Sequence, residues 1–128
     1  MNVFKAVQDF HEKFKVKWAP KPDTLPSYIY QYRLGFLNEE LVEFVDAHNA
    51  GDIEGELDAM VDLIYVASGT LYLMGFSAEK QAEAFKRVHE ANMKKKRAKN
   101  ANESKRGHAF DVVKPAGWKA PDLSDLCR

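Results

Sequence analysis

The sequence lacks the features of a disulfide-stabilised, membrane-spanning or secreted protein. It has a single cysteine, Cys127, among its 128 residues, so an internal disulfide is excluded and we expect a reducing cytoplasm. It has no run of about 20 apolar residues, which a membrane helix needs. Charged residues interrupt positions 1–16, where a signal peptide would be apolar. These absences predict a soluble, cytoplasmic protein that does not bind a membrane.

The sequence also lacks an excess of either charge. It contains 19 Lys and Arg against 19 Asp and Glu. A dedicated nucleic-acid-binding domain usually carries a basic excess, so no nucleic-acid partner is expected. The length suits one domain, and 45% hydrophobic with 30% charged residues is a globular composition. A nucleotide-binding enzyme stays compatible with this balance, because the charges are grouped along the chain.

Apolar residues recur at helical spacing in four segments. We predict helices over residues 2–16, 27–49, 53–74 and from 77 to about 96 or beyond. A proline-rich break separates the first two, Ala50–Asp52 forms a turn, and the third helix is expected to be the most buried. The predicted cap residues are Asn2 and Ser77 at helix starts and Gly75 at a helix end.

Four helices with short connections predict an all-α, four-helix bundle. We assign residues 1–98 to a helical domain, which would carry any active site, and residues 99–128 to an irregular tail that packs on the same domain. The tail is rich in Pro, Gly and aromatic residues from about Phe110 onward. A lid over a binding site and a cap on the helical core are equally consistent with that composition.

Acidic residues form the most informative pattern. Glu40 and Glu43 share one helix face, and Glu39 is one turn before Glu43. Glutamates alone would suit an ordinary solvated face. The next predicted helix adds Asp58 and Asp62, however, and Asp62 precedes an apolar run in which an unpaired carboxylate would be costly. Converging carboxylates repel one another, so the pattern predicts a bound hard cation, Mg²⁺ or alternatively Mn²⁺.

Basic and aromatic residues offer partners for a phosphorylated ligand. The run Lys94–Arg97 either complements the end of a helix dipole or holds phosphates beside the metal. His11 is more often a structural or surface residue in such a position than a binding residue. Trp18 and Trp118 either cover the core or stack on a base.

Four segments of this chain carry a resemblance to a known family. They are Glu39-Glu40-x-x-Glu43, Asp62-Leu-Ile-Tyr65, Asn92-Met93-x-Lys95 and Asp111-Val-Val-Lys114-Pro-x-Gly-Trp118-x-x-Pro121. The sequence resembles the all-α nucleotide pyrophosphohydrolases over roughly residues 10–121. Within that superfamily it is similar to the MazG-like and phosphoribosyl-ATP-pyrophosphohydrolase-like enzymes of a phage or bacterial branch.

The resemblance implies cleavage of a nucleoside triphosphate into a monophosphate and pyrophosphate by a homo-oligomer, a dimer or a tetramer. It implies that Glu40, Glu43 and Asp62 are metal ligands and that Glu39 orients or deprotonates the attacking water or binds a further metal. Asn92 and Lys95 would contact the substrate. The further candidates for substrate binding are Lys96, Tyr65, His11, Lys114 and Trp118.

The sequence departs from the family pattern at one position. The second acidic block usually reads Glu-x-x-Asp, and Ala59 stands where the glutamate is expected. Asp58 either supplies the missing carboxylate or leaves a site with fewer ligands. The alternative function is therefore a non-catalytic helical module that binds nucleotides or a protein. The base and sugar stay open: we prefer a deoxynucleoside triphosphate, with phosphoribosyl-ATP as an alternative.

Overall fold

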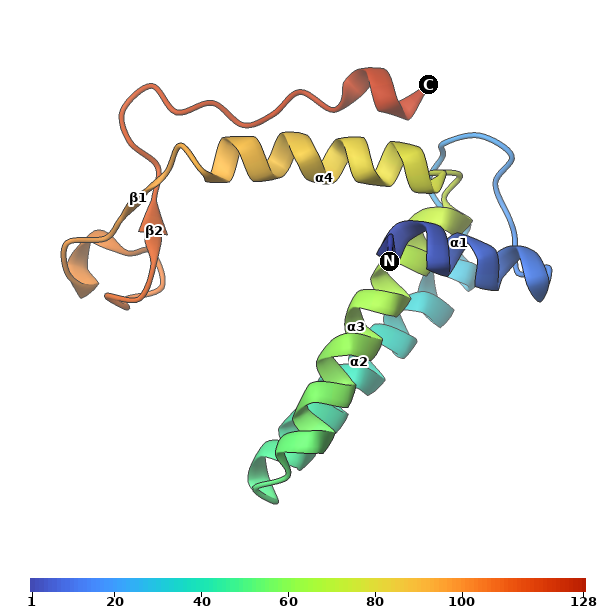
Figure 1. Cartoon of the computed structure of the whole chain (residues 1–128), viewed down its shortest axis with the longest axis horizontal. Helices are drawn as coiled ribbons and strands as arrows, with labels where there is room; N and C mark the ends of the chain where they lie inside the picture. Colours follow the sequence, from blue (N-terminus) through green and yellow to red (C-terminus); the bar gives the residue numbers. More distant parts are fainter. The chain divides into compact units, whose positions relative to one another are not determined.

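A computed structural model describes residues 1–128 and contains four α-helices (Figure 1). The helices are α1 (Val3–Lys13), α2 (Ser27–Asn49), α3 (Ile53–Leu73) and α4 (Ala78–Asn92). Two short strands, β1 (Lys96–Arg97) and β2 (Val112–Val113), pair antiparallel. Two 3₁₀ turns, η1 (Ala101–Glu103) and η2 (Ser124–Cys127), complete the elements. The predicted all-α fold is confirmed.

Packing divides the chain into two compact units. Unit 1 comprises residues 1–81 and 127–128, and unit 2 comprises residues 82–126. The sequence placed a domain boundary near residue 98 instead. That boundary stays a prediction, because a packing unit is not the same as an independently folding domain.

The turns between helices follow from their local sequence. The Asp52 side chain accepts a hydrogen bond from the Gly55 amide (3.0 Å), which caps the start of α3. Gly75 has a φ of +93°, and the Phe76 amide bonds back to the Leu71 carbonyl (3.0 Å). This is the left-handed helix end that glycine favours. The predicted caps at Asn2 and Ser77 are also present (3.2 and 3.3 Å).

Two predicted helix ends were wrong. The first helix stops at Lys13 rather than near residue 16, because Lys15 turns into the left-handed region with a φ of +57°. The fourth helix stops at Asn92 rather than near residue 96. Lys96 and Arg97 instead pair with β2, an interaction with residues far along the chain that local helical preference does not reveal.

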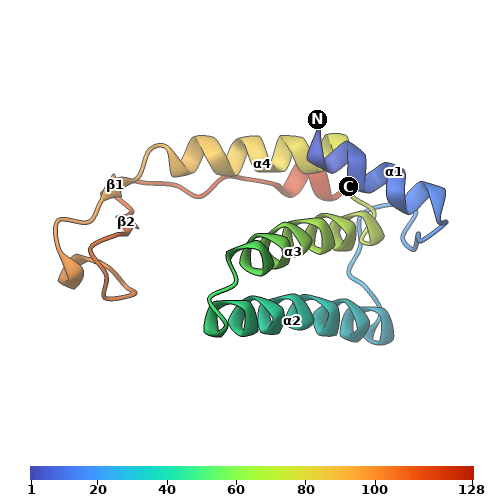
Figure 2. The same cartoon turned by 60° about the horizontal axis from the view of Figure 1, so that its bottom comes forward.

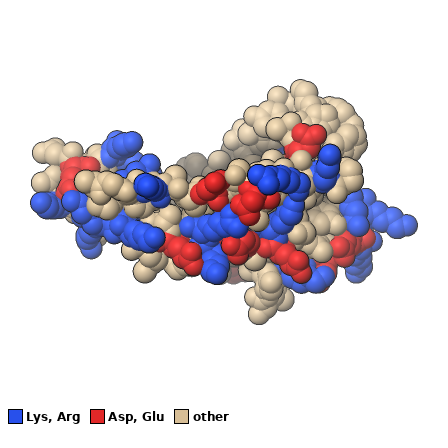
Figure 3. Space-filling model, turned by 90° about the horizontal axis from the view of Figure 1, so that it is seen from above, with Lys and Arg blue, Asp and Glu red and all other residues tan.

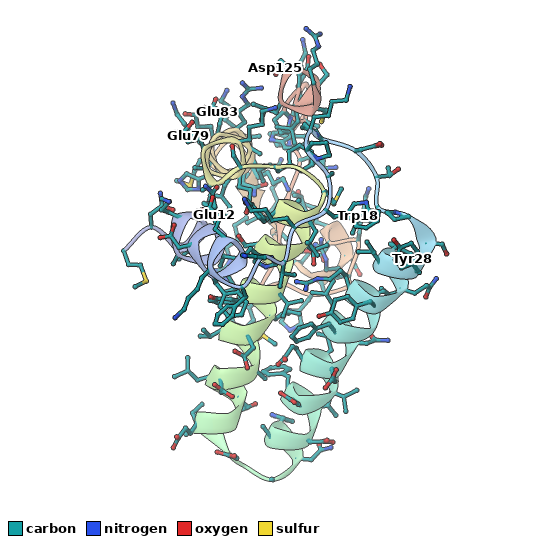
Figure 4. The ribbon with its side chains drawn as sticks, turned by 90° about the vertical axis from the view of Figure 1, so that its right-hand side faces the viewer. Glu12, Trp18, Tyr28, Glu79, Glu83 and Asp125 are labelled. Atoms are coloured by element: carbon teal, nitrogen blue, oxygen red, sulfur yellow. The ribbon has the colours of Figure 1, made fainter.

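Unit 1 is built around the α2–α3 hairpin. Figure 2 shows α2 and α3 running antiparallel side by side, joined by the Ala50–Asp52 turn. α1 packs on α3. The proline-rich segment before α2 is anchored by Trp18, whose ring lies edge-on to Tyr28 with centroids 5.7 Å apart (Figure 4).

The core of unit 1 is small. Its fully buried apolar side chains are Val7, Ala59, Val66 and Leu73, together with Ala78. α3 has more buried residues than α1 or α2, as expected for the most buried helix. Much of the apolar stripe predicted to be core is nevertheless exposed: Leu34, Leu41, Val45, Leu57, Val61, Ile64 and Leu71. Periodicity identifies residues that share a face, but not what covers that face.

The length and hydropathy of each helix decide whether it could span a membrane. No single helix is long and apolar enough to cross a membrane. Only α3 and α4 taken together, across the bend at their junction, reach that length and composition.

Unit 2 consists of the later part of α4, the short β-ribbon and the tail. The tail returns along α4, where Arg87 binds the Asp125 carboxylate through two nitrogens (2.6 and 3.0 Å). The Trp118 indole donates to the Ala91 carbonyl at the end of α4 (2.7 Å). The tail is therefore ordered against α4 by specific hydrogen bonds.

Polar side chains from α1 and α2 meet on the surface of α3 inside unit 1. Arg33 is 5% exposed and donates to the Thr70 hydroxyl and to the Val66 carbonyl (both 3.0 Å). His11 is 3% exposed, and its Nδ1 hydrogen-bonds the Val16 carbonyl (2.7 Å). Both side chains lie against Gly69, where a Cβ atom would collide with them.

Gly69→Ala should therefore destabilise the protein by about 1–3 kcal/mol, because the two neighbouring side chains are held by hydrogen bonds and cannot swing aside. Gly35→Ala is the matched control. Nothing lies within 4 Å of a Cβ at that helical position, so it should stabilise the protein by about 0.5–1 kcal/mol. Urea unfolding midpoints measure both effects, and shifts of the same sign would contradict the packing described.

Candidate metal centre

Three carboxylates meet between the two long helices of unit 1. Glu40 and Glu43 come from α2, where a spacing of three residues puts both on one face. Asp62 comes from α3. One oxygen from each residue lies within 4.8 Å of the other two. We call these three residues the acidic group.

Glu40 is the buried member of the group. It is 6% exposed, and its Oε2 atom has no hydrogen-bond partner. The pKa of Glu40 is raised to about 7, first by burial, then by the hydrogen bond and charge of Glu43, and then by the charges of Asp62 and Glu39. The ionised form of Glu40 is therefore unfavourable, because no partner at its Oε2 atom offsets its burial and the neighbouring negative charges.

This arrangement fits a divalent cation. A buried oxygen without a partner is costly, and two further carboxylates beside it increase that cost by repulsion. A cation between them would satisfy the oxygen and reverse the repulsion. All of the donors are carboxylate oxygens, which suit Mg²⁺ or Mn²⁺ rather than a soft metal.

The other predicted acidic residues lie outside the acidic group. Glu39 is exposed on α2, next to Glu40 in sequence. Asp58 is exposed and lines a hollow of about 720 Å³ with Asp52 and Glu54. Ala59 is 1% exposed, so the position at which the family pattern has a glutamate is packed. The roles of Glu39 and Asp58 stay predictions.

Two candidates for substrate binding belong to unit 1. Tyr65 is half-buried, and its ring lies edge-on to Phe10 with centroids 5.4 Å apart. Burial lowers the pKa of His11, although its hydrogen bond to Val16 opposes this. The structure gives His11 the role of a packed, neutral side chain beside Arg33. A substrate contact by either residue stays a prediction.

The remaining candidates belong to unit 2, and three of them lie together. The ammonium groups of Lys95 and Lys114 each lie 5.0 Å from the centre of the Trp118 ring. Lys96 is exposed, with Glu103 at 3.8 Å, and Asn92 is exposed at the end of α4. Two cations are thus placed on one aromatic side chain, an arrangement suited to a phosphorylated ligand.

Sequence reasoning missed Arg33. The sequence has no Lys or Arg between Leu34 and Glu79, so Arg33 is the nearest cation along the chain before the acidic group. It lines a hollow of about 360 Å³ with Tyr30, Thr70 and Met74 among others. Its partners are hydroxyl and carbonyl oxygens rather than a carboxylate. The only available signal was an arginine within an apolar helical stripe, which also suits a surface residue.

Comparison with known proteins gives one match. The model of a family described as phosphoribosyl-ATP pyrophosphohydrolase matches residues 7–103. The matched range includes the acidic group, Lys95 and Lys96, and it stops before Lys114 and Trp118. No individual curated protein matches the chain.

The raised pKa of Glu40 predicts how metal-free stability depends on pH. The folded protein holds this proton up to about pH 7, whereas the unfolded chain loses it near pH 4.5. The folded state therefore binds more protons between these values, and the contribution of Glu40 to stability falls as pH rises through this window. In chelator, Glu40→Gln should melt at a higher temperature than the wild type at pH 8 and differ less at pH 4.5.

Asp46→Asn, which neutralises an exposed carboxylate on the same helix, is the matched control. It should reproduce the pH dependence of the wild type. Adding Mg²⁺ at pH 8 should raise the melting temperature of the wild type more than that of Glu40→Gln. Equal melting temperatures of wild type and Glu40→Gln at pH 8 in chelator would contradict the strained state of Glu40.

Proposed function

The chain belongs to the phosphoribosyl-ATP pyrophosphohydrolase family, and we propose that it is a Mg²⁺-dependent nucleoside triphosphate pyrophosphohydrolase. Membership makes it a hydrolase of the phosphoric anhydride bonds of nucleotides in general. The finer proposal is cleavage of a (deoxy)nucleoside triphosphate to the monophosphate and pyrophosphate. The observation that carries it is the acidic group, with its buried and unpartnered Glu40 oxygen.

The residues divide the work of hydrolysis between them. Glu40, Glu43 and Asp62 would hold the cation, which when bound would supply positive charge to the polyphosphate and lower the pKa of a nearby water. Glu39 is exposed beside Glu40 and accepts the proton of the attacking water. The water oxygen bonds to phosphorus as the α–β anhydride bond breaks, and pyrophosphate leaves.

The cations of unit 2 are proposed to hold the phosphates. Lys95, Lys96 and Asn92 lie at or just beyond the end of α4, within the range that matches the family. Trp118 offers a ring for stacking on the base, and Lys114 adds a cation beside it. The competing role for Trp118 is to cover the end of α4, which its bond to Ala91 supports. Both roles are compatible with a half-buried indole.

Two alternatives to this proposal stay open. Phosphoribosyl-ATP, the compound in the family's description, contains the same anhydride bond and belongs to the same reaction class. A non-catalytic module is favoured by one observation: Ala59 fills the position of a fourth carboxylate with a buried methyl group. A panel of nucleoside triphosphates, deoxynucleoside triphosphates and phosphoribosyl-ATP with Mg²⁺ separates these alternatives by release of pyrophosphate.

Glu43→Ala and Asp62→Ala should each lower turnover by roughly a hundredfold or more, because several kcal/mol of transition-state stabilisation depend on the cation that they hold. Pyrophosphate release measures the loss, and circular dichroism checks that the helices remain. Glu54→Ala, an exposed carboxylate on α3 outside the acidic group, is the matched control. Full activity in either ligand variant would remove that residue from the proposed metal set.

Asp58→Ala gives a graded comparison in the same assay. Asp58 lies one helical turn from Asp62 but outside the acidic group. As an auxiliary ligand it should raise the Mg²⁺ concentration needed for half-maximal activity and leave kcat nearly unchanged. An unaltered half-saturation would make Asp58 a solvated neighbour.

We also propose that the active form is a homo-oligomer, with a dimer as the smallest unit. Ile53, Leu57, Val61 and Ile64 form an exposed stripe along α3 at spacings of three and four residues. Leu57, Val61 and Ile64 are each more than half exposed. A contiguous apolar stripe of this kind is unusual on the surface of a monomer.

Val61→Lys should therefore dissociate the oligomer, because a buried ammonium without a partner opposes assembly. Light scattering coupled to gel filtration should report at least a dimer for the wild type and a smaller species for Val61→Lys. Val3→Lys, a similarly exposed valine on α1, should leave the mass unchanged. A wild-type monomer at micromolar concentration would contradict assembly through this stripe.

A further inference from the structure

The balanced charge of the whole chain is an average over two units of opposite sign. Unit 1 contains 8 Lys and Arg against 13 Asp and Glu, whereas unit 2 contains 11 Lys and Arg against 6 Asp and Glu. The argument against a nucleic-acid partner used the neutral total. It does not apply to unit 2 considered by itself, which has the basic excess typical of such partners.

The excess is concentrated in residues 94–114, which comprise β1, β2 and the segment between them. We call this segment the basic ribbon. It contains eight Lys and Arg and two acidic residues. Figure 3 shows several Lys and Arg side chains over the part of unit 2 that carries β1 and β2.

Both acidic residues of the basic ribbon are already engaged. Asp111 is bound by the Arg106 guanidinium (2.8 Å) and the Ser104 hydroxyl (2.6 Å). Glu103 accepts a hydrogen bond from the Lys99 amide (2.7 Å) and lies near Lys96. The remaining cations have no carboxylate of the ribbon to neutralise them, so the surface attracts an anion.

An exposed aromatic ring lies among these cations. Phe110 is 82% exposed, although a phenylalanine gains nothing from contact with water. The His108 ring stacks on it with centroids 5.3 Å apart, and Arg97 also lies 5.3 Å from its centre. Beside it is a hollow of about 360 Å³, lined by Arg97, Phe110, Asp111 and Val112. The hollow therefore combines the aromatic ring of Phe110 with the guanidinium of Arg97.

The free nucleotide substrate does not account for this surface. The proposed substrate contacts use only Lys95, Lys96 and Lys114 of the ribbon, and these three cations already match the negative charge that remains on a triphosphate bound to a divalent cation. The rest of the excess extends along the two strands and their connection. Cations in a row with an exposed ring suit a chain of phosphates whose bases are free to stack.

We propose that the basic ribbon binds single-stranded nucleic acid. Lys99, Lys105 and Arg97 contact successive phosphates, and Phe110 stacks on one base. A duplex fits less well, since its bases are already stacked on one another and do not offer a face to Phe110. This function is separate from hydrolysis and needs neither the acidic group nor a metal.

Fluorescence anisotropy of the full-length protein with labelled 20-nucleotide dT and U oligomers, in chelator, tests the proposal. At 50 mM salt we expect a Kd in the range of about 1–100 μM, and a plot of log K against log salt with a slope of roughly −2, because each of the three contacted phosphates of a single strand contributes about −0.7. The DNA and RNA arms show which sugar is preferred. A labelled duplex of equal length should bind more weakly.

Variants assign the binding to the ribbon. Phe110→Ala should weaken binding about fivefold or more, and Phe110→Tyr, which keeps the ring, should not. Replacing Lys99 and Lys105 by Gln should make the slope less steep by roughly 1–1.5. The matched controls in unit 1 are Phe14→Ala and the pair Lys13→Gln and Lys17→Gln, which should bind as the wild type does.

Glu43→Ala should also keep full oligonucleotide binding, because the proposed metal centre takes no part. The proposal would be overturned by no binding at 50 mM salt, by binding that Phe110→Ala and the lysine pair leave unchanged, or by tighter binding of the duplex. Loss of binding in Glu43→Ala would place the oligonucleotide at the metal centre instead and would also overturn the proposal that the basic ribbon binds it.

Discussion

Repulsion among Glu40, Glu43 and Asp62 is the constraint on which the rest of unit 1 depends. The short turn between α2 and α3, with Gly51 in the left-handed region and Asp52 as the cap, fixes the two helices antiparallel. That packing brings the three carboxylates within 4.8 Å of one another. The hairpin would be more stable without this charge, and a cation bound among the three carboxylates would restore the stability that their repulsion removes.

The sequence predicted the helices well because their signals are local. Asn2, Ser77 and Gly75 act as caps through neighbours a few residues away, and the α2 boundaries match the prediction completely. The spacing of Glu40 and Glu43, together with the tight turn between α2 and α3, also predicted that these two carboxylates would lie near Asp62. What could not be predicted depends on distant residues. Lys96 and Arg97 leave the helix because of Val112 and Val113.

Arg33 illustrates the same limit within the α2–α3 hairpin. Its hydrogen-bond partners, Thr70 and Val66, lie on another helix, so the sequence of α2 alone does not predict that the Arg33 guanidinium is buried. The exposed stripe on α3 is the converse case. Its period was correctly predicted to be apolar, yet Val61 and Ile64 face outward, because a period defines a face and not its neighbour. The local sequence pattern therefore predicts where the helices lie, whereas the residues that cover each helix face depend on tertiary packing.

The absence of Lys and Arg between Leu34 and Glu79 has a consequence for proteolysis. Trypsin cleaves after these two residues, so complete digestion of the denatured chain releases the α2–α3 hairpin as one peptide, residues 34–80. All three carboxylates of the acidic group leave on that single fragment. Carbodiimide labels carboxylates, so labelling of the folded protein with and without a divalent cation would report on the acidic group through the mass of this one peptide. The lysine-rich remainder of the chain is cut into small pieces.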